Sequence, residues 1–256
     1  NLNNLENWNG WNSWNGWNAL HLICCYNSSV EYRSLILENG IDINEKTNES
    51  WNALHLICRH NLQAKNGFNG LLKCISLLLK NGINIHEKTN NSLNSWKSWN
   101  ALHLICKYNP QAIAGPQESV ECISLLLENG IDINEKTNDG FNALHLICDN
   151  NLSVEYISLL LENGININEK VYNNMNVLHL ICTNSRATID TNRSVECASF
   201  LLENGIDINE KTNDGWNALH LICEYNPSVE YISLLLENGI DINEKMNEGL
   251  NDGMNS

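Results

Sequence analysis

Long apolar runs, basic residues and glycine-rich phosphate loops are scarce or missing in this sequence of 256 residues. No stretch approaches the roughly 18 unbroken apolar residues of a membrane-spanning helix, so no membrane span is expected. Fifteen Lys and Arg face thirty Asp and Glu, which gives a net charge of -15. Because the acidic residues recur along the whole chain, phosphate backbones are repelled and nucleic acid is not an expected partner. The glycines end helices or lie in turns, where backbone freedom is needed, so none is assigned to a phosphate loop.

What the sequence has in abundance is one segment of the form Trp-Asn-Ala-Leu-His-Leu-Ile-Cys, which occurs six times with small changes. Each copy is followed by a second helical stretch that ends near Leu-Leu-Glu-Asn-Gly-Ile-Asp-Ile-Asn. Steps of 34, 48, 42, 34 and 41 residues separate the histidines that mark the copies, which are His21, His55, His103, His145, His179 and His220. Self-similarity at this period is typical of a solenoid, whose units bury their apolar faces only against their neighbours.

The shortest unit, residues 141–174, indicates how one repeat folds. Asn142 lies at a helix N-cap position, and apolar residues at helical spacing predict a first helix, helix A, over about 143–149. Polar turn residues follow, and the stripe from Val154 to Leu161 predicts a second helix, helix B, that ends at Asn163-Gly164. Alternating Ile and Asn residues then predict a short extended arm and a polar turn that lead to the next repeat.

This pattern resembles the ankyrin repeat over residues 17–249. Leu-His of helix A, Leu-Leu-Leu of helix B and Gly-Ile-Asp-Ile-Asn correspond to positions that mark that family. The resemblance implies an all-α, ankyrin-type helix-turn-helix solenoid of six repeats with β-turn fingers. Asn-Ala in place of Thr-Pro, and Ile-Cys in place of paired alanines, predict altered stacking of the repeats.

The expected domain organisation follows from the repeats, which share a continuous core without an internal boundary. A Trp- and Asn-rich segment at 1–16 precedes them, and 250–256 begins a truncated seventh repeat. Repeats 1 to 6 are expected at 17–50, 51–98, 99–140, 141–174, 175–215 and 216–249.

The turn between helix A and helix B occurs in two lengths. Where it is short, helix B carries Tyr32, Tyr156 or Tyr231, and where it is seven or eight residues longer, Cys takes the place of Tyr. A small apolar Cys can simply fit beneath the longer turn. Alternatively, the two cysteines of each long-turn hairpin form a disulfide, the pairs being Cys58–Cys74, Cys106–Cys122 and Cys182–Cys197. Free thiols would indicate the cytoplasm, and paired cysteines an extracellular location.

Each helix A places a His and a Cys one helical turn apart, which is half of a zinc site. Neighbouring repeats stack about 10 Å apart, too far to share one ion at ligand distances of roughly 2.0 to 2.3 Å. The ankyrin resemblance implies instead that these histidines bridge backbone groups of adjacent repeats. Because the histidines recur at equivalent positions and not in a single pocket, we predict no catalytic residue, no cofactor and no metal.

A row of large side chains precedes the helix A motifs, and aromatic residues concentrate binding energy at interfaces. In ankyrin repeats this position borders the concave face, where partners are commonly held. We therefore predict a non-enzymatic scaffold that binds a basic or neutral polypeptide along the fingers and helix A. In the alternative, each ring packs on the next finger and only stiffens the row. The predicted partner-binding residues are Trp17, Trp51, Trp99, Phe141, Met175, Trp216, Tyr108 and Tyr225.

The two ends of the array suggest an alternative function. Neither end shows the polar capping unit that an isolated solenoid usually needs. The alternative is a structural subunit that assembles end to end into a filament, because open heterologous contacts generate filaments when the rotation does not close. The residues expected to take part are Trp8, Trp11, Trp14, Met246, Leu250 and Met254. The expected partner is thus another protein or further copies of this chain.

Overall fold

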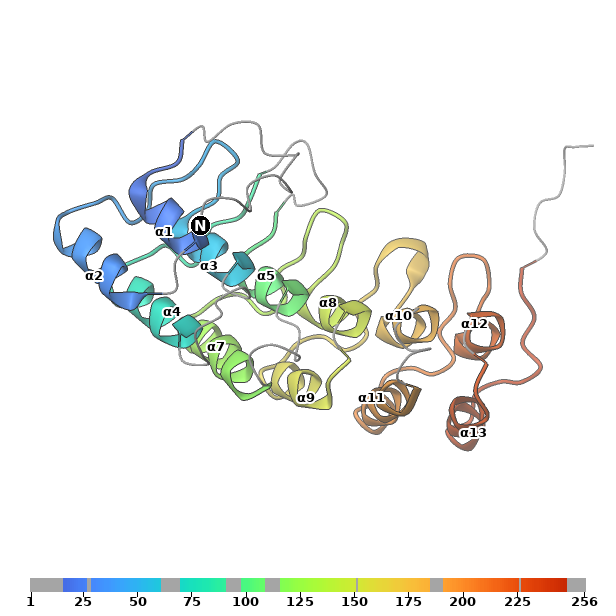
Figure 1. Cartoon of the computed structure of the whole chain (residues 1–256). Helices are drawn as coiled ribbons and strands as arrows, with labels where there is room; N and C mark the ends of the chain where they lie inside the picture. Colours follow the sequence, from blue (N-terminus) through green and yellow to red (C-terminus); the bar gives the residue numbers. More distant parts are fainter. Residues whose placement is uncertain are drawn as a thin grey trace, which may run out of the picture. The chain divides into compact units, whose positions relative to one another are not determined.

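The computed structural model describes residues 16–26, 29–60, 70–90, 98–108, 116–150, 152–184, 191–225 and 227–247. Within these residues the regular elements are helices, in which a helix A and a helix B follow each other along the chain (Figure 1). The described residues divide into two compact units, unit 1 up to Ile131 and unit 2 from Asp132. The sequence limits of the six repeats, and the absence of a boundary between them, stay predictions.

Unit 1 contains three helical hairpins. Its helix A elements are α1 (Ala19–Tyr26), α3 (Ala53–His60) and α5 (Ala101–Tyr108). Its helix B elements are α2 (Val30–Glu38), α4 (Gly70–Lys80) and α7 (Pro116–Glu128). Helix α3 packs between α1 and α5, and α4 packs between α2 and α7, so each kind of helix forms its own row.

Unit 2 contains three further hairpins arranged in the same two rows. Its helix A elements are α8 (Ala143–Asn150), α10 (Val177–Thr183) and α12 (Ala218–Tyr225). Its helix B elements are α9 (Val154–Glu162), α11 (Thr191–Glu203) and α13 (Val229–Glu237), and a 3-10 helix η3 (Tyr172–Asn174) precedes α10. The predicted hairpin of repeat 4 is confirmed, since α8 ends one residue beyond the predicted limit and α9 ends just before Asn163-Gly164.

The core lies between the two rows of helices. In α3, α5 and α8 the whole segment Ala-Leu-His-Leu-Ile-Cys is buried, because helix A contacts its own helix B as well as a neighbouring helix A. Burial of such side chains is worth roughly 1.5–3 kcal/mol for each large aliphatic residue. In the described part of the chain, no helix combines the length and the apolar character needed to cross a bilayer.

Each helix B ends in the same way, at an asparagine followed by a glycine. The asparagine Nδ2 donates to the carbonyl oxygen four residues earlier at 2.7 or 2.8 Å, at Asn39, Asn81, Asn129, Asn163, Asn204 and Asn238. The glycine that follows has φ between +82° and +86°, a conformation that other residues adopt only with strain. The Asn-Gly pair therefore ends helix B and turns the chain into the arm.

Asparagine side chains also connect the arms of consecutive repeats. In unit 1, Asn44 Oδ1 accepts from Asn84 N at 2.7 Å and Asn44 Nδ2 donates to Gly82 O at 3.1 Å. In unit 2, Asn134 makes the same two contacts with Asn166 N and Gly164 O, at 3.0 and 3.3 Å. An amide side chain offers a donor and an acceptor, as a peptide group does, so these residues join one arm to the next.

Candidate functional site

An asparagine and a histidine cap each other at the start of every helix A. In repeat 4, His145 N donates to Asn142 Oδ1 at 3.1 Å, and Asn142 N donates to His145 Nδ1 at 3.2 Å. The same reciprocal contacts join Asn18 to His21, Asn52 to His55, Asn100 to His103, Asn176 to His179 and Asn217 to His220. The predicted N-cap at Asn142 is confirmed, and it satisfies a first-turn N–H that the helix itself leaves unpaired.

The second ring nitrogen connects helix A to the arm that follows helix B. His145 Nε2 donates to the Glu169 carbonyl oxygen at 3.1 Å, since Nδ1 is the acceptor and Nε2 must carry the proton. The same contact, at 3.0 or 3.1 Å, joins His21 to Glu45, His55 to Glu87 and His179 to Glu210. A structural role is confirmed for these four histidines, but each one bridges helix A to the arm of its own repeat and not, as predicted, to an adjacent repeat.

Burial determines the charge of these rings. It lowers the pKa of His55, His145 and His179 to about 4, so all three are neutral at pH 7. A neutral imidazole whose two nitrogens are both engaged has no lone pair left for a metal ion. Among the described residues, no three His, Cys, Asp or Glu side chains gather closely enough to hold a metal. The arrangement can therefore cap a helix and bridge to an arm, which is scaffold chemistry.

All ten cysteines are free thiols, and eight of them are buried. The three disulfides that the sequence left open, Cys58–Cys74, Cys106–Cys122 and Cys182–Cys197, are not formed in the structure. Burial raises the pKa of Cys24 and of Cys182 to about 12, so these thiols are protonated at neutral pH and unreactive. The interior cysteines therefore behave as small apolar residues.

The helix B cysteine faces the preceding repeat, which explains why it is not paired within its own hairpin. Burial, and after it the nearby Cys122, raises the pKa of Cys58 well above its usual range. Burial, and after it the nearby Cys197, likewise raises the pKa of Cys148 well above its usual range. Where the position is Tyr, the Tyr231 hydroxyl lies 3.8 Å from Cys182 Sγ of the preceding repeat. The Cys or Tyr side chain of helix B therefore fills the junction between its own repeat and the preceding one.

The fingers form a connected row in unit 2. Asn213 N donates to Asn173 O at 3.0 Å, and Asn247 N donates to Asp214 O at 3.1 Å, so these two bonds join three successive fingers. Gly215 has φ +80°, and a Cβ there would lie 2.6 Å from Asn247 N. Only glycine permits this close approach of the two fingers.

In unit 1 two aromatic rings beside the fingers, Trp51 and Trp99, are closed off from solvent. Trp51 is 0% exposed and Trp99 is 6% exposed. The Arg59 guanidinium lies 5.5 Å from the Trp51 ring and 5.0 Å from the Tyr108 ring, and the Tyr108 and Trp99 rings are 6.4 Å apart. Cation–π contacts of this kind hold the four side chains together. The burial of Trp51 and Trp99 agrees with the alternative in which the rings stiffen the row.

In unit 2 the corresponding rings leave aromatic surface exposed. Phe141 is half-buried against a cluster that contains the buried Met175, and its ring lies 5.7 Å from the Tyr172 ring, whose residue is 59% exposed. Trp216 is half-buried, and its ring lies 6.4 Å from the ring of Tyr225, which is 56% exposed. The two pairs offer edges and faces of rings to a partner.

The remaining predicted site residues lie partly exposed in the two units or outside the described residues. Trp17 and Tyr108 are half-buried in unit 1. Met246 of the proposed end contact is 48% exposed. The other residues predicted for end-to-end assembly lie outside the described residues, namely Trp8, Trp11, Trp14, Leu250 and Met254.

Sequence reasoning missed Arg59 and Tyr172. A signal for Tyr172 was present, because the other five fingers have Asn where Tyr172 replaces it. A residue that departs from its own repeat at the surface is a candidate for binding. For Arg59 we find no such signal, since this position of helix A varies in every repeat.

Comparison with known proteins agrees with this geometry. A family profile described as ankyrin repeats (3 copies) matches residues 2–89, 63–171, 110–191 and 169–246. The crystal structure of the human ASB11 ankyrin repeat domain superposes with a TM-score of 0.68 at 21% sequence identity, over 90% of this chain and 87% of that chain. That likeness shows the fold alone, and no curated protein matches the sequence. Because the family profile extends over most of the residues, and because the helices, caps and fingers repeat as described, this chain belongs to the ankyrin repeat family.

Proposed function

We propose that this chain is a non-enzymatic scaffold that binds a polypeptide along the finger and helix A face of unit 2. Ankyrin repeat proteins generally mediate protein–protein interaction and are typically without enzymatic activity. The observation that carries the proposal is the exposure of Tyr172, on a finger, and of Tyr225, at the end of α12, beside the half-buried rings of Phe141 and Trp216. Exposed Tyr rings supply a large contact area at a low entropic cost.

The charge of the fingers supports a polypeptide as the partner. The finger lysines of unit 2 form ion pairs with glutamates of the next finger at 2.7 or 2.8 Å, namely Lys136–Glu169, Lys170–Glu210 and Lys211–Glu244. Their positive charge is therefore already compensated and does not favour a phosphate backbone. With a net charge of -15, the chain attracts basic or neutral segments more readily than acidic ones.

The proposal is tested by selecting peptides from a random phage-displayed library on the full chain. The affinity of an enriched peptide is then measured for the wild type, Tyr225→Ala and Tyr26→Ala. Tyr26 is a matched control, because it occupies the same helix A position in unit 1 and is similarly exposed, at 52%. We expect Tyr225→Ala to weaken binding at least about fivefold, which corresponds to the usual hot-spot threshold of about 1 kcal/mol.

Tyr26→Ala should leave the affinity unchanged. Equal affinity of the wild type, Tyr172→Ala and Tyr225→Ala would place the peptide elsewhere and overturn the proposal. So would a loss on Tyr26→Ala that matches the loss on Tyr225→Ala.

End-to-end self-association is a second candidate, favoured by the exposed apolar side chains of the first and last repeats. Tyr32 is 55% exposed in repeat 1, and Cys223 is exposed in repeat 6. Tyr32 is equivalent to Tyr231, and Cys223 is equivalent to Cys182. Inside unit 2, the Tyr231 hydroxyl and the Cys182 Sγ lie 3.8 Å apart and form a junction between two repeats. A second copy could therefore repeat this contact between Tyr32 of one chain and Cys223 of another.

Sedimentation of the full chain over a range of concentrations tests this candidate. Mass should rise with concentration, and Tyr32→Lys should prevent the rise, because it would place a charge in an apolar junction. Tyr172→Lys serves as the control for the loss of an exposed ring. A wild-type chain that stays monomeric at every concentration would remove this candidate.

A further inference from the structure

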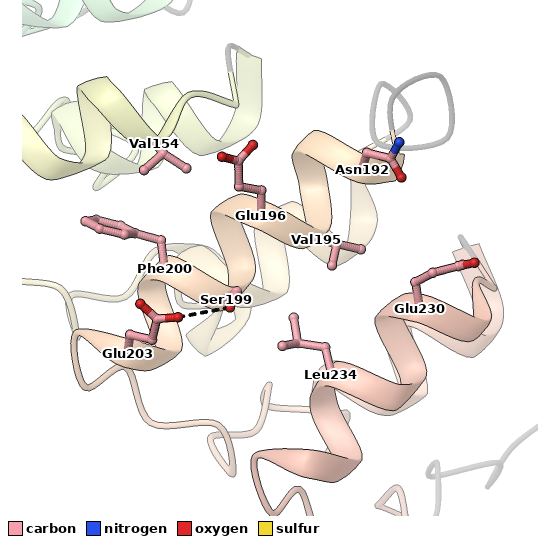
Figure 2. Close-up of a pocket in the computed structure, with 9 residues that line it drawn as sticks. All are labelled: Val154, Asn192, Val195, Glu196, Ser199, Phe200, Glu203, Glu230 and Leu234. Carbon is pink, nitrogen blue, oxygen red and sulfur yellow. Dashed lines mark hydrogen bonds between the residues drawn. The ribbon is translucent and has the colours of Figure 1, made fainter.

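The helix B row of unit 2 carries a groove that the proposed function does not use. The groove lies along α11 and is bounded by α9 and α13, with a volume of about 490 Å³ (Figure 2). Its apolar lining consists of Val154 from α9, Val195 and Phe200 from α11, and Leu234 from α13. All four side chains are partly exposed. An apolar surface hollowed between helices is a form that binds a further element.

Two features of repeat 5 shape the groove. Helix α11 has 13 residues, whereas α9 and α13 have 9, and the additional first turn brings Asn192 into the lining (Figure 2). Phe200 also replaces the leucine that α9 and α13 have at this position, Leu159 and Leu234. Repeat 5 therefore offers a longer wall and a larger apolar side chain than its neighbours.

Exposed carboxylates border the apolar lining. Glu196 and Glu203 of α11 and Glu230 of α13 are among the residues that line the groove. Glu203 accepts from Ser199 Oγ at 3.3 Å, and Glu230 accepts from Ser228 Oγ at 2.9 Å. The backbone N–H of Glu230 and the Ser228 hydroxyl lower the pKa of the Glu230 carboxyl, so this carboxylate is ionised at neutral pH. Neutral hydroxyls orient these groups without cancelling their charge.

The equivalent helices of unit 1 have a different charge pattern. Helix α4 carries Lys73 and Lys80 where α11 has Glu196 and Glu203, while α2 and α7 keep glutamates at both positions. Opposite charges therefore alternate from α2 to α4 to α7. Helices α9, α11 and α13 together hold six glutamates and a single basic residue, Arg193. The negative charge of this face is thus left for a partner to neutralise.

We propose that this groove is a docking site for a basic amphipathic helix of a partner protein. Apolar side chains spaced three and four residues apart on such a helix would cover Phe200 and Leu234. Lysines or arginines on its flanks would extend along the groove and place their charges at Glu196, Glu203 and Glu230. The site belongs to the helix B row and the finger face to the helix A row, so the chain would engage polypeptide through two different surfaces (Figure 1).

The probe for this site is a fluorescein-labelled synthetic helix made of leucines on one face and lysines on the other. Its binding to the full chain is followed by fluorescence anisotropy. We expect saturable binding that Glu196→Gln with Glu203→Gln weakens at least about fivefold, and Phe200→Ala by a similar factor. Higher salt should weaken binding further, because charges at the rim are screened.

Two matched controls separate the groove from the general acidity of the chain. Glu31→Gln with Glu38→Gln in α2 changes the net charge equally, and Leu77→Ala removes the α4 counterpart of Phe200. Both should change the affinity less than about twofold. Circular dichroism melts of all variants confirm that they fold.

Three outcomes would overturn the proposal. Equal weakening by both glutamate pairs would reduce the effect to bulk charge. Unchanged affinity in Phe200→Ala would remove the apolar contact. Full displacement of the peptide by spermidine, which has no apolar face, would show a site for polycations and not for a helix.

Discussion

Unit 1 and unit 2 use the same caps, arms and junctions but expose different side chains. Beside the fingers, Trp51 and Trp99 of unit 1 are buried around Arg59, whereas Phe141 and Trp216 of unit 2 are half-buried next to the exposed Tyr172 and Tyr225. Tyr26 of unit 1 is exposed as well. On the helix B row, glutamates and lysines alternate in unit 1, while glutamates dominate in unit 2. The buried positions of the repeat therefore maintain the fold, and a few surface substitutions decide where a partner can bind.

Acid is expected to have the largest effect and to reach both units. Burial lowers the pKa of His55 in unit 1, and of His145 and His179 in unit 2, from 6.5 to about 4. Between these values the unfolded chain binds protons that the folded chain excludes, so stability falls as the pH falls. Each histidine contributes at most about 1.4 kcal/mol per pH unit. Urea unfolding midpoints measured across this range should decrease steadily, and a midpoint that rises on acidification would contradict the assignment.

Removing one capping histidine is the next largest change. His145→Ala in unit 2 and His55→Ala in unit 1 both leave an asparagine N–H and a glutamate carbonyl without their partner. We expect each to lower the free energy of unfolding by roughly 1–3 kcal/mol, the cost of unpaired buried polar groups. Circular dichroism in urea measures both. If only one of the two variants lost stability, the histidine caps would not have the same role in both units.

Arg59→Ala should expose aromatic rings of unit 1 to solvent, as in unit 2. Without the guanidinium, the Trp51 and Tyr108 rings lose a cation–π partner and gain contact with water. We expect a loss of about 1–2 kcal/mol and a red shift of tryptophan fluorescence. Lys73→Ala, on the exposed surface of α4, is the control. An unshifted emission spectrum in Arg59→Ala would mean that Arg59 does not protect the ring.

Lys170→Ala removes one of the ion pairs between fingers and should lower the free energy of unfolding only slightly. Lys170 and Glu210 are partly exposed and 2.7 Å apart, and such pairs contribute about 1 kcal/mol or less. Lys46→Ala, at the Lys46–Glu87 pair of unit 1, should behave alike. High salt should reduce both effects. A loss as large as that of His145→Ala would show that the ion pairs, and not the caps, join the fingers.

A reducing agent is expected to have no effect on either unit. All ten cysteines are free, so the unfolding midpoint should be the same with and without dithiothreitol. Thiol titration under denaturing, non-reducing conditions should count ten groups, and in the native state Cys223 should react first because it is exposed. A count of four, which is ten less the six cysteines of three pairs, would restore the disulfides.

Local features of the repeat could be predicted from sequence because their causes are local. Asn142, the helix limits of repeat 4 and the Asn-Gly helix end depend on residues a few positions apart. The histidine bridge was available only through the family resemblance, since Glu169 lies 24 residues from His145. Asparagine also recurs along the whole sequence. The structure shows one reason, since asparagine side chains tie one arm to the next.

Contacts between repeats could not be predicted, because spacing along the chain does not determine how hairpins stack. Pairing Cys58 with Cys74 assumed that helix B faces its own helix A, whereas the pKa of Cys58 responds to Cys122 of the next repeat. The burial of Trp51 and Trp99 has a similar origin, since Arg59 and Tyr108 come from two different repeats. A row of equivalent residues in the sequence is therefore not a row of equivalent surfaces.

Hydrogen–deuterium exchange on the full chain tests most directly whether binding belongs to unit 2. The exchange is measured without ligand, with a library-selected peptide and with the leucine-lysine helix. The account predicts protection around Tyr172 and Tyr225 with the first ligand and along α11 with the second, and no change in unit 1. Protection centred on Trp51 and Trp99, or spread equally over both units, would contradict it.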